Sequence, residues 1–417
     1  MTSARHRNIR RKIKEIAIGT VALLTMTVPM LSTSATAQEE TNGFRVTFLV
    51  SDLPNIAAKT LDPNLVNPWG IATSSGSPFW VSDNNAGVAT LYNTDGSNVL
   101  RLPRVSIPNP VDICGAVGTP TGTVFNIDGG TLGGFPITNG TKSASAVFLF
   151  ATEDGTIVGW NPGVNPDACV TQADGTSITG IIAVDNSGNN LTNPPNGSGA
   201  VYKGLAIAMS DAPIVAGVPT STALLYATNF RSGKVDVFGT DFKPVPLATG
   251  AFTDPSLPDG YAPFNIVLIN GKLVVTYAMQ DANRHDDVAG QSHGFVNIFN
   301  LDGSGLRRLA QHGQLNSPWG VALAPAAFGE FAGDLLIGNF GNGHINAFDL
   351  GSGEFLGKVN DPHGQVIALD GLWSLRVGNG GNGGDSDKVY FTAGPFGETH
   401  GLFGSLCSVQ SSTCPSP

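Results

Sequence analysis

The sequence predicts an all-β protein, a six-bladed β-propeller with four-stranded blades whose last blade is closed by the N-terminal strand. Three observations lead to this fold: a duplicated phrase, a scarcity of helical periodicity, and the number of short apolar runs. The phrase Asn67-Pro68-Trp69-Gly70 returns as Ser317-Pro318-Trp319-Gly320, and each copy continues into strands separated by acidic or glycine turns. A supersecondary unit of about 50 residues that recurs indicates a repeat architecture.

Runs of β-branched and aromatic residues, bounded by Gly, Asn and Asp, predict the individual strands. With the duplicated phrase as the template, these runs fall into groups of four, and each group predicts one blade. The expected strands are 69–73, 79–83, 88–93 and 104–107 in blade one; 122–125, 146–151, 156–160 and 178–184 in blade two; 203–208, 223–228, 234–238 and 245–248 in blade three; 264–269, 272–278, 294–299 and 306–310 in blade four; and 319–323, 334–338, 344–348 and 355–359 in blade five.

The sixth group contains three runs, 372–377, 388–392 and 401–406, before the chain ends. The run 44–50 near the N-terminus is left over and would supply the fourth strand of this blade. When the N-terminal strand completes the last blade in this way, the ring is closed and no sheet edge is left exposed there. A β-sandwich or a solenoid is the alternative, but neither requires the N-terminus to complete the last sheet.

The chain is expected to have three parts: a signal peptide at 1–37, the propeller at 38–406 and a C-terminal tail at 407–417. The first part has a basic beginning, an apolar stretch at 16–31 and the small-residue site Ala35-Thr36-Ala37, which together are typical of export and cleavage. A membrane anchor is the alternative, although the apolar stretch is short of the roughly 20 residues that a span needs.

Removal of the predicted signal takes away six of the 22 basic and one of the 32 acidic residues, which leaves a net charge of −15. An acidic surface without basic runs disfavours nucleic acid as a partner. No second apolar stretch reaches the length of a membrane span. We therefore expect a secreted protein, extracellular or periplasmic, and a monomer.

Four cysteines in an exported chain predict two disulfides, with three possible connectivities. Cys407 and Cys414 would close a small loop in the tail, and Cys114 and Cys169 would then join two insertions of blade two. A catalytic thiol or a cysteine metal site is disfavoured by the even number and by the lack of a C-x-x-C motif.

Propeller topology places the starts of the innermost strands and the loops between second and third strands on one face. Tryptophans, amides and charged residues gather in these segments, and a concave mouth of that composition is the default binding-site hypothesis. The candidate ligand-binding residues are Asn67, Trp69, Glu153, Lys203, Asn229, Arg231, Asn265, Trp319, Asn339 and Trp373. The alternatives are packing between blades for the tryptophans and turn capping for the acidic residue.

Two other sets on this face could carry chemistry. The long loop 280–293 contains His285, Asp286, Asp287 and His293, whose oxygen and imidazole groups could hold Ca²⁺ or Zn²⁺. A solvated acidic loop is the alternative. Asp370, Glu398 and His400 are the candidate catalytic residues, as a carboxylate–imidazole set on blade six that could perform general acid–base chemistry.

The segment 79–93 resembles the repeat of NHL-type and gluconolactonase-like six-bladed propellers. Several phrases also resemble an uncharacterised family of secreted propeller proteins found mainly in bacteria. They are Asn67-Pro68-Trp69-Gly70, Ala151-Thr152-Glu153-Asp154-Gly155, Tyr226-Ala227-Thr228-Asn229-Phe230-Arg231-Ser232-Gly233, 315–320, Phe391-Thr392-Ala393-Gly394-Pro395 and His400-Gly401-Leu402-Phe403-Gly404. The resemblance covers nearly the whole mature chain and implies six blades, but no activity.

Gluconolactonase-like enzymes hold a divalent metal in the channel with a Glu, an Asn and an Asp near the starts of the innermost strands. Here the corresponding candidates are Asp370, Asn265 and Glu153, with Ca²⁺ or Zn²⁺ as the possible ion. The sequence departs from that pattern, because no glutamate lies among the expected starts of these strands.

Two functional hypotheses follow. The first is a non-catalytic binding or scaffold module whose mouth recognises a carbohydrate, a peptide or a protein, and the lack of a complete catalytic set favours it. The second is a divalent-metal-dependent, lactonase-like hydrolase that uses Asp370, Asn265 and Glu153 or His400 around the channel. Fold alone does not decide between them.

Overall fold

The computed structural model describes residues 42–128, 134–166, 169–188, 198–210 and 222–415. The contacts divide the chain into two units, Met1–Glu40 and Thr41–Pro417. The predicted signal peptide lies outside the described residues and stays a prediction. Everything below concerns the second unit.

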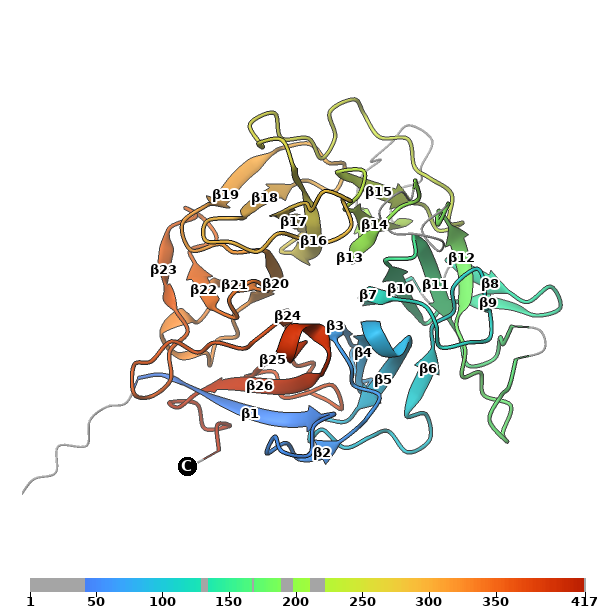
Figure 1. The fold of residues 1–417 in the computed structure, drawn as a ribbon, viewed down its shortest axis with the longest axis horizontal. Helices are drawn as coiled ribbons and strands as arrows, with labels where there is room; N and C mark the ends of the chain where they lie inside the picture. The colour runs from blue at the N-terminus through green and yellow to red at the C-terminus, as the bar shows by residue number, and fades with distance from the viewer. Residues whose placement is uncertain (1–41, 129–133, 167–168, 189–197, 211–221, 416–417) are drawn as a thin grey trace, which may run out of the picture. The chain divides into compact units, whose positions relative to one another are not determined.

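Six small sheets, antiparallel except for one two-residue edge strand, follow one another around a centre, each with one innermost strand (Figure 1). Blade one contains β3 (Pro68–Ala72), β4 (Phe79–Asp83), β5 (Val88–Tyr92) and β6 (Arg104–Ser106); blade two β7 (Pro120–Phe125), β10 (Phe148–Thr152), β11 (Thr156–Trp160) and β12 (Ile181–Asp185); and blade three β13 (Tyr202–Ser210), β14 (Thr222–Asn229) and β15 (Lys234–Phe238). Blade four contains β16 (Tyr261–Ile269), β17 (Lys272–Met279), β18 (Phe295–Phe299) and β19 (Arg307–Gln311), and blade five β20 (Pro318–Leu323), β21 (Leu335–Asn339), β22 (Ile345–Phe348) and β23 (Phe355–Lys358). The hairpin of β8 (Pro136–Thr138) and β9 (Ser143–Ser145) stands beside blade two.

Blade six confirms the closure by the N-terminal strand. Strand β1 (Phe44–Ser51) pairs along its length with β26 (Leu402–Ser408), beyond which lie β25 (Val389–Ala393) and β24 (Leu372–Val377). The two-residue β2 (Thr60–Leu61) adds a short fifth strand outside β1. The innermost strands β3, β7, β13, β16, β20 and β24 contact one another in cyclic order, so the ring closes between the two ends of the chain. The predicted fold class is therefore confirmed.

Blade three differs from the expected four strands. The predicted strand 245–248 is not formed, and only a bridge between Phe238 and Pro244 and a hydrogen bond from Val245 N to Val237 O continue the sheet there. Pro244 and Pro246 flank Val245, whose N–H donates this hydrogen bond. Because proline has no N–H, a segment with prolines at these positions cannot extend a regular ladder.

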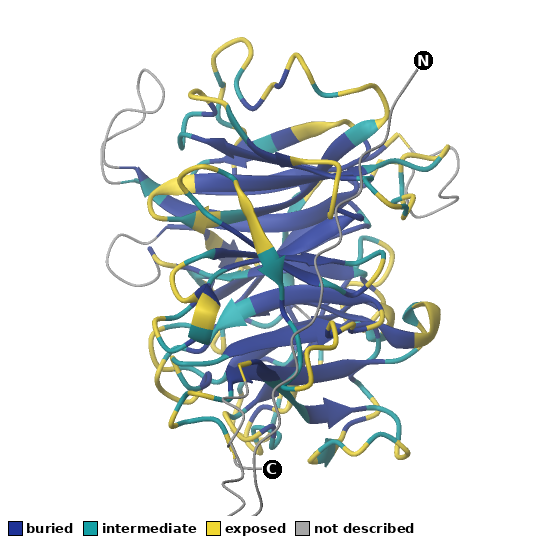
Figure 2. Ribbon diagram, turned by 90° about the vertical axis from the view of Figure 1, so that its left-hand side faces the viewer, coloured by how far each residue is buried: buried dark blue, intermediate teal, exposed yellow. Residues whose placement is uncertain are grey.

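The core lies between the blades. Buried aliphatic and aromatic residues of neighbouring sheets pack face to face, and exposed residues are concentrated in the connecting loops (Figure 2). Both predicted disulfides are formed: Cys114 with Cys169, and Cys407 with Cys414.

The innermost strands approach each other most closely at glycines. A Cβ placed on Gly70 would lie 2.6 Å from Thr121 O, and one on Gly122 would lie 2.4 Å from Leu205 N. The same conflict with the next blade exists at Gly204 and Gly320. Most of the contacting atoms are backbone atoms of the next blade, which cannot move aside. The blades can therefore be this close only where these positions carry no side chain.

We expect the substitution Gly122→Ala to lower the free energy of unfolding by about 1–3 kcal/mol, because the added methyl group overpacks a rigid contact between two strands. Denaturant unfolding of purified protein measures this change. The control is Gly76→Ala, since a Cβ on Gly76 meets no atom within 4 Å. Equal stability of the two variants would contradict the proposed role of close blade contact.

Candidate functional site

The strand registers define one face of the ring, which we call the mouth face. Pro68 at the start of β3 pairs with Asp83 at the end of β4, and Pro318 pairs with Asn339 in the same manner in blade five. Tyr202 likewise pairs with Asn229 in blade three. The starts of the innermost strands and the loops after the second strands therefore share this face, as predicted.

One side chain from each innermost strand contributes to a layer beneath the mouth face. The aromatic members form a buried cluster with Phe230 and with the partly buried Phe340. We call the set Trp69, Thr121, Lys203, Phe264, Trp319 and Trp373 the channel layer. Trp69 and Trp373 stack with ring centroids 3.5 Å apart, and Trp319 meets both edge-on. The three tryptophans are at most 3% exposed, so packing accounts for them, and a contact with ligand stays a prediction.

Lys203 is the charged member of the channel layer, and its side chain is 2% exposed. The ammonium group donates to Glu153, lies 3.4 Å from Asp286 Oδ1 and sits 5.0 Å from the ring centroid of Trp69. The second oxygen of Glu153 accepts a hydrogen bond of 2.8 Å from Asn84. Burial lowers the pKa of Lys203, but the charges of Glu153 and Asp286 outweigh it and leave the pKa above its ordinary value. The buried ammonium is therefore charged.

Four acidic side chains interact with this ammonium: Glu153, Asp286, Asp287 and Glu398. We call these four residues and Lys203 the mouth cluster. Burial raises the pKa of Glu398 to about 7, and the charges of Glu153, Asp287 and Asp286 add to the rise. Burial also raises the pKa of Asp287 to about 6. For Asp286 burial acts in the same direction, but the His285 ring 2.8 Å away and the charge of Lys203 hold the pKa below its ordinary value.

Glu398 is positioned by a strained turn, α1 (Pro395–Glu398). Phe396 and Glu398 have φ angles of 57° and 67°, which non-glycine residues rarely adopt. Asp370 accepts a hydrogen bond of 2.9 Å from Phe396 N, and Asn85 donates one of 2.7 Å to Glu398 O. The turn leaves the Phe396 side chain 62% exposed. Backbone strain of this kind is often concentrated at functional sites.

Four of the other predicted binding residues lie on the mouth face, whereas Asn265 lies deeper, within β16, and hydrogen bonds hold all five in place. Asn67 accepts from the Trp373 indole at 2.9 Å. The remaining donors and their acceptors are Asn229 to Asp236, Arg231 to Gly199 O, Asn265 to Trp319 O, and Asn339 to Gln314 O. All five side chains belong to buried residues. Direct contact of these residues with a ligand stays a prediction.

The three candidate catalytic residues have separate partners. Asp370 accepts a hydrogen bond from Phe396 N, and His400 Nδ1 lies 2.7 Å from Asp52 Oδ2. Glu398 belongs to the mouth cluster. Among the described residues, no recorded hydrogen bond joins the three into one acid–base set. Asp52 follows the N-terminal strand, so its pairing with His400 depends on the ring closure and leaves no local signal in the sequence.

The candidate metal ligands Asp370, Asn265 and Glu153 likewise engage different groups. In the described part of the chain, the side chains that could share an ion are instead Glu153, His285 and Asp286, whose ligand atoms lie within 4.8 Å of one another. The Lys203 ammonium already contacts two of these three. A divalent ion there would face a charge of the same sign in a poorly solvated place, so these residues do not fit a resident metal.

Asp286, Asp287 and Phe396 belong to the site but were not among the predicted binding residues. The sequence signal for the first two was the long loop 280–293, which we interpreted as a possible metal loop. The sequence carries no signal for the exposed ring of Phe396, because its exposure follows from the left-handed backbone of α1.

Comparison with known proteins identifies relatives. No protein-family model matches the chain. The chain is 33% identical over 371 residues to uncharacterized protein R648 of Acanthamoeba polyphaga mimivirus. The matched residues make up 88% of this chain and 81% of R648. It is 32% identical over 371 residues to uncharacterized protein L690 of the same virus, with 88% and 86% covered. The chain belongs to the family of R648 and L690. These relatives are viral, and they give no support to the bacterial distribution that the sequence resemblance implied.

Solved structures resemble this member of the R648 family at the level of the fold. Streptogramin B lyase is 12% identical with a TM-score of 0.45, over 88% of this chain and 98% of the lyase. The soluble aldose sugar dehydrogenase of Escherichia coli is 11% identical with a TM-score of 0.48, over 87% and 99%. Such distant likeness carries no argument about activity. No helix within the described residues has the length and apolar character needed to cross a membrane.

We expect Lys203→Met to lower the free energy of unfolding by about 3–5 kcal/mol, because Glu153 would remain buried without its counter-charge. The double variant Lys203→Met/Glu153→Gln should recover part of this loss, which denaturant unfolding can measure. Lys243→Met, which breaks an exposed pair with Asp241, is the control and should unfold almost as the wild type does. A double variant no more stable than Lys203→Met would argue against the pairing.

The stability of the folded chain should depend on the protonation of Glu398. Its folded pKa of about 7 lies above the ordinary value of 4.5, so the folded state binds more protons between these values. The resulting stability is fully present below about pH 4.5 and is lost as the pH rises to about 7, by about 1–3 kcal/mol. Urea unfolding at pH 5 and pH 8 should show a smaller loss for Glu398→Gln than for the wild type. The exposed Glu354→Gln is the matched control, and an equal pH dependence in all three proteins would refute the assignment.

Proposed function

We propose that this protein is a secreted binding module that captures the cationic group of a ligand at the mouth cluster. The observation that carries the proposal is the crowding of that cluster, where four carboxyl groups interact with the Lys203 ammonium and Arg231 is the other cation that interacts with Asp286. Two of these carboxyls, Asp287 and Glu398, have pKa values raised by burial, and the neighbouring acids contribute. A second cation beside them would relieve both the repulsion and the poor solvation.

The chemistry of the exposed surface supports an ammonium or guanidinium group as the bound part. Asp286 has 67% of its side chain exposed, and Phe396 is 62% exposed on the turn that carries Glu398. A carboxylate and an aromatic ring are the two partners that organic cations use most, through a charge-assisted hydrogen bond and a cation–π contact. The ligand is therefore expected to be a basic peptide side chain or an amino sugar, within the predicted classes of carbohydrate, peptide and protein.

The scaffold beneath the cluster favours binding over catalysis. The stacked channel layer fixes Lys203, and Lys203 fixes Glu153 and Asp286, so the carboxylates are held before a ligand arrives. Pre-organisation of this kind reduces the entropic cost of binding. The alternative, a metal-dependent hydrolase, has no specific observation in its favour, because the Lys203 ammonium lies against two of the three groups that would hold the metal.

Secretion is part of the proposal. The predicted signal peptide and two disulfides formed by all four cysteines both agree with an oxidising compartment outside the cytoplasm. An extracellular or periplasmic location would bring the mouth into contact with ligands outside the cell.

The test is isothermal titration calorimetry at about 0.15 M salt, where unspecific attraction to the acidic surface is screened. The probes are glucosamine, an acetylated arginine amide and, as the neutral counterpart, N-acetylglucosamine. We expect binding of the cationic probes only, with an affinity that rises between pH 5.5 and pH 8 as Glu398 ionises. Glu398→Gln should weaken binding about tenfold at pH 8, as loss of a charge-assisted contact predicts.

Glu354→Gln removes the same charge from an exposed turn of blade five and should bind as the wild type does. The proposal fails if the neutral sugar binds as well as glucosamine, or if the affinity is the same at both pH values. Preference between the arginine probe and the amino sugar would decide which of the two ligand classes the mouth accepts.

A further inference from the structure

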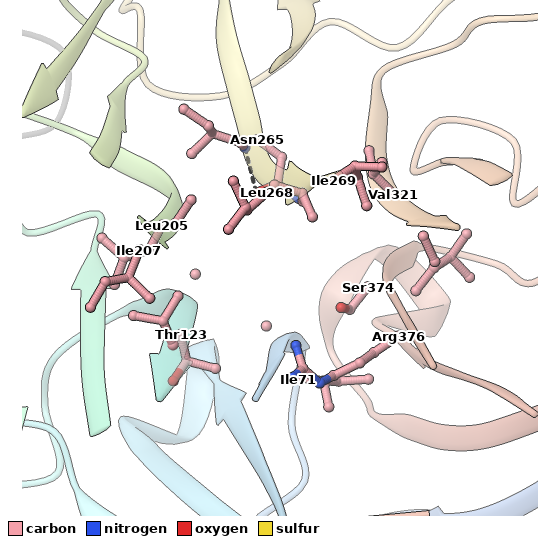
Figure 3. A pocket seen from close by; sticks show the side chains of 18 of the residues that line it. Ile71, Thr123, Leu205, Ile207, Asn265, Leu268, Ile269, Val321, Ser374 and Arg376 are labelled. Carbon is pink, nitrogen blue, oxygen red and sulfur yellow. Dashed lines mark hydrogen bonds between the residues drawn. The ribbon is translucent and has the colours of Figure 1, made fainter. Parts of the chain in front are cut away.

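A second site is suggested by the part of the channel beyond the channel layer. A cavity of about 420 Å³ is lined there by residues of all six innermost strands, and Asn265 and Trp319 close it toward the mouth. Its walls are mostly aliphatic, with Ile71, Leu205 and Val321 among them (Figure 3). At its other end the rim includes Leu268 and Ile127, which are 37% and 46% exposed. The cavity therefore opens away from the mouth cluster.

Arg376 is the one charged side chain among the described residues that line this cavity. It belongs to β24, and Figure 3 draws it among the side chains that line the cavity, together with Ile71 and Ser374. Nε and Nη2 donate to the side chain of Thr73, at 3.3 and 3.0 Å, and Nη2 also donates to Thr73 O. These contacts fix the guanidinium group at the cavity wall.

No acidic residue of the described chain forms an ion pair with Arg376. All the recorded partners are neutral oxygens of one residue, and the two N–H groups of Nη1 have no recorded acceptor in the described part of the chain. Burial lowers the pKa of Arg376 to about 10, so the group still carries its charge at neutral pH. A cation in an apolar cavity without a counter-ion is unfavourable, and an anion that enters the cavity would offset that cost.

We propose that this cavity, which we call the lower channel site, binds a small organic carboxylate with an aliphatic body. The guanidinium group of Arg376 offers the planar fork that matches a carboxylate, and Ser374, which also lines the cavity, has a hydroxyl that can act as a further donor. The aliphatic walls bury the hydrocarbon part of the ligand. A cavity of this size falls within the range of small-molecule sites.

The lower channel site is distinct from the mouth cluster in position and in charge. The stacked rings of Trp69, Trp319 and Trp373 lie between the two. The mouth cluster selects a cation and the lower channel site an anion, so the two proposals can fail separately.

The experiment is calorimetric titration of the full mature chain with butyrate, hexanoate and octanoate at pH 7 and about 0.15 M salt. Hexanol and hexylammonium are the charge controls on the same hydrocarbon body. We expect the affinity to rise by up to about fourfold for each added methylene until the cavity is filled. Hexanol and hexylammonium should bind at least tenfold more weakly than hexanoate.

Arg376→Gln should weaken hexanoate binding at least about tenfold, whereas Arg307→Gln, on an outer strand of blade four, should leave it unchanged. Circular dichroism checks that both variants fold. If Arg376→Gln does not fold, the wild-type comparison of the three C6 compounds decides alone. The proposal is overturned if hexylammonium or hexanol binds as tightly as hexanoate, or if folded Arg376→Gln binds hexanoate as the wild type does.

Discussion

The close approach of the six innermost strands is the constraint on which the rest of the structure depends. Glycines at equivalent places in four of these strands let neighbouring backbones meet without an intervening side chain. At the starts of the strands the ring is then so narrow that six side chains fill it as the channel layer. Hydrogen bonds between blades lock this layer, such as Thr121 Oγ1 to Tyr202 O and Asn265 to Trp319 O. The stacking of the tryptophan rings therefore follows from the narrowness of the ring as well as from the attraction between aromatic side chains.

The same narrowness explains why Lys203 needs its acidic partners. A lysine at this position of the layer cannot extend its ammonium into water, since its side chain is 2% exposed. Only a nearby carboxylate can stabilise the charge, and Glu153 comes from the neighbouring blade to provide it. The site is therefore built across blades, and the strength of each contact depends on the closure of the whole ring.

The sequence was sufficient to predict the fold and the face of the site, because the blade repeat, strand alternation and turn chemistry are local patterns. It also named Glu153 and Lys203 as candidate binding residues, and the structure brings the two side chains together, while their contact with a ligand stays a prediction. The strand expected at 245–248 was wrong because two prolines outweigh an apolar pattern. The pairing of His400 with Asp52 joins residues 348 positions apart and depends on ring closure. The Arg376 guanidinium could not be placed from the sequence either, because the register of β24 shifts between Leu372 and Leu375 and its hydrogen-bond partner Thr73 belongs to another blade.

The unfavourable features of the molecule are unevenly distributed, and their positions support the two proposed sites. The left-handed residues of α1, the raised pKa of Glu398 and that of Asp287 all oppose folding at neutral pH, and all three lie at the mouth. A chain selected for stability alone would lose such features easily, since a glutamine or a glycine at these positions would remove each of them. Arg376 repeats the argument at the other end of the channel, where an aliphatic residue would complete the cavity wall. A ring that its channel layer keeps rigid can tolerate these unfavourable features, because contacts between blades, such as Lys203 with Glu153 and Arg376 with Thr73, hold the charged groups in place.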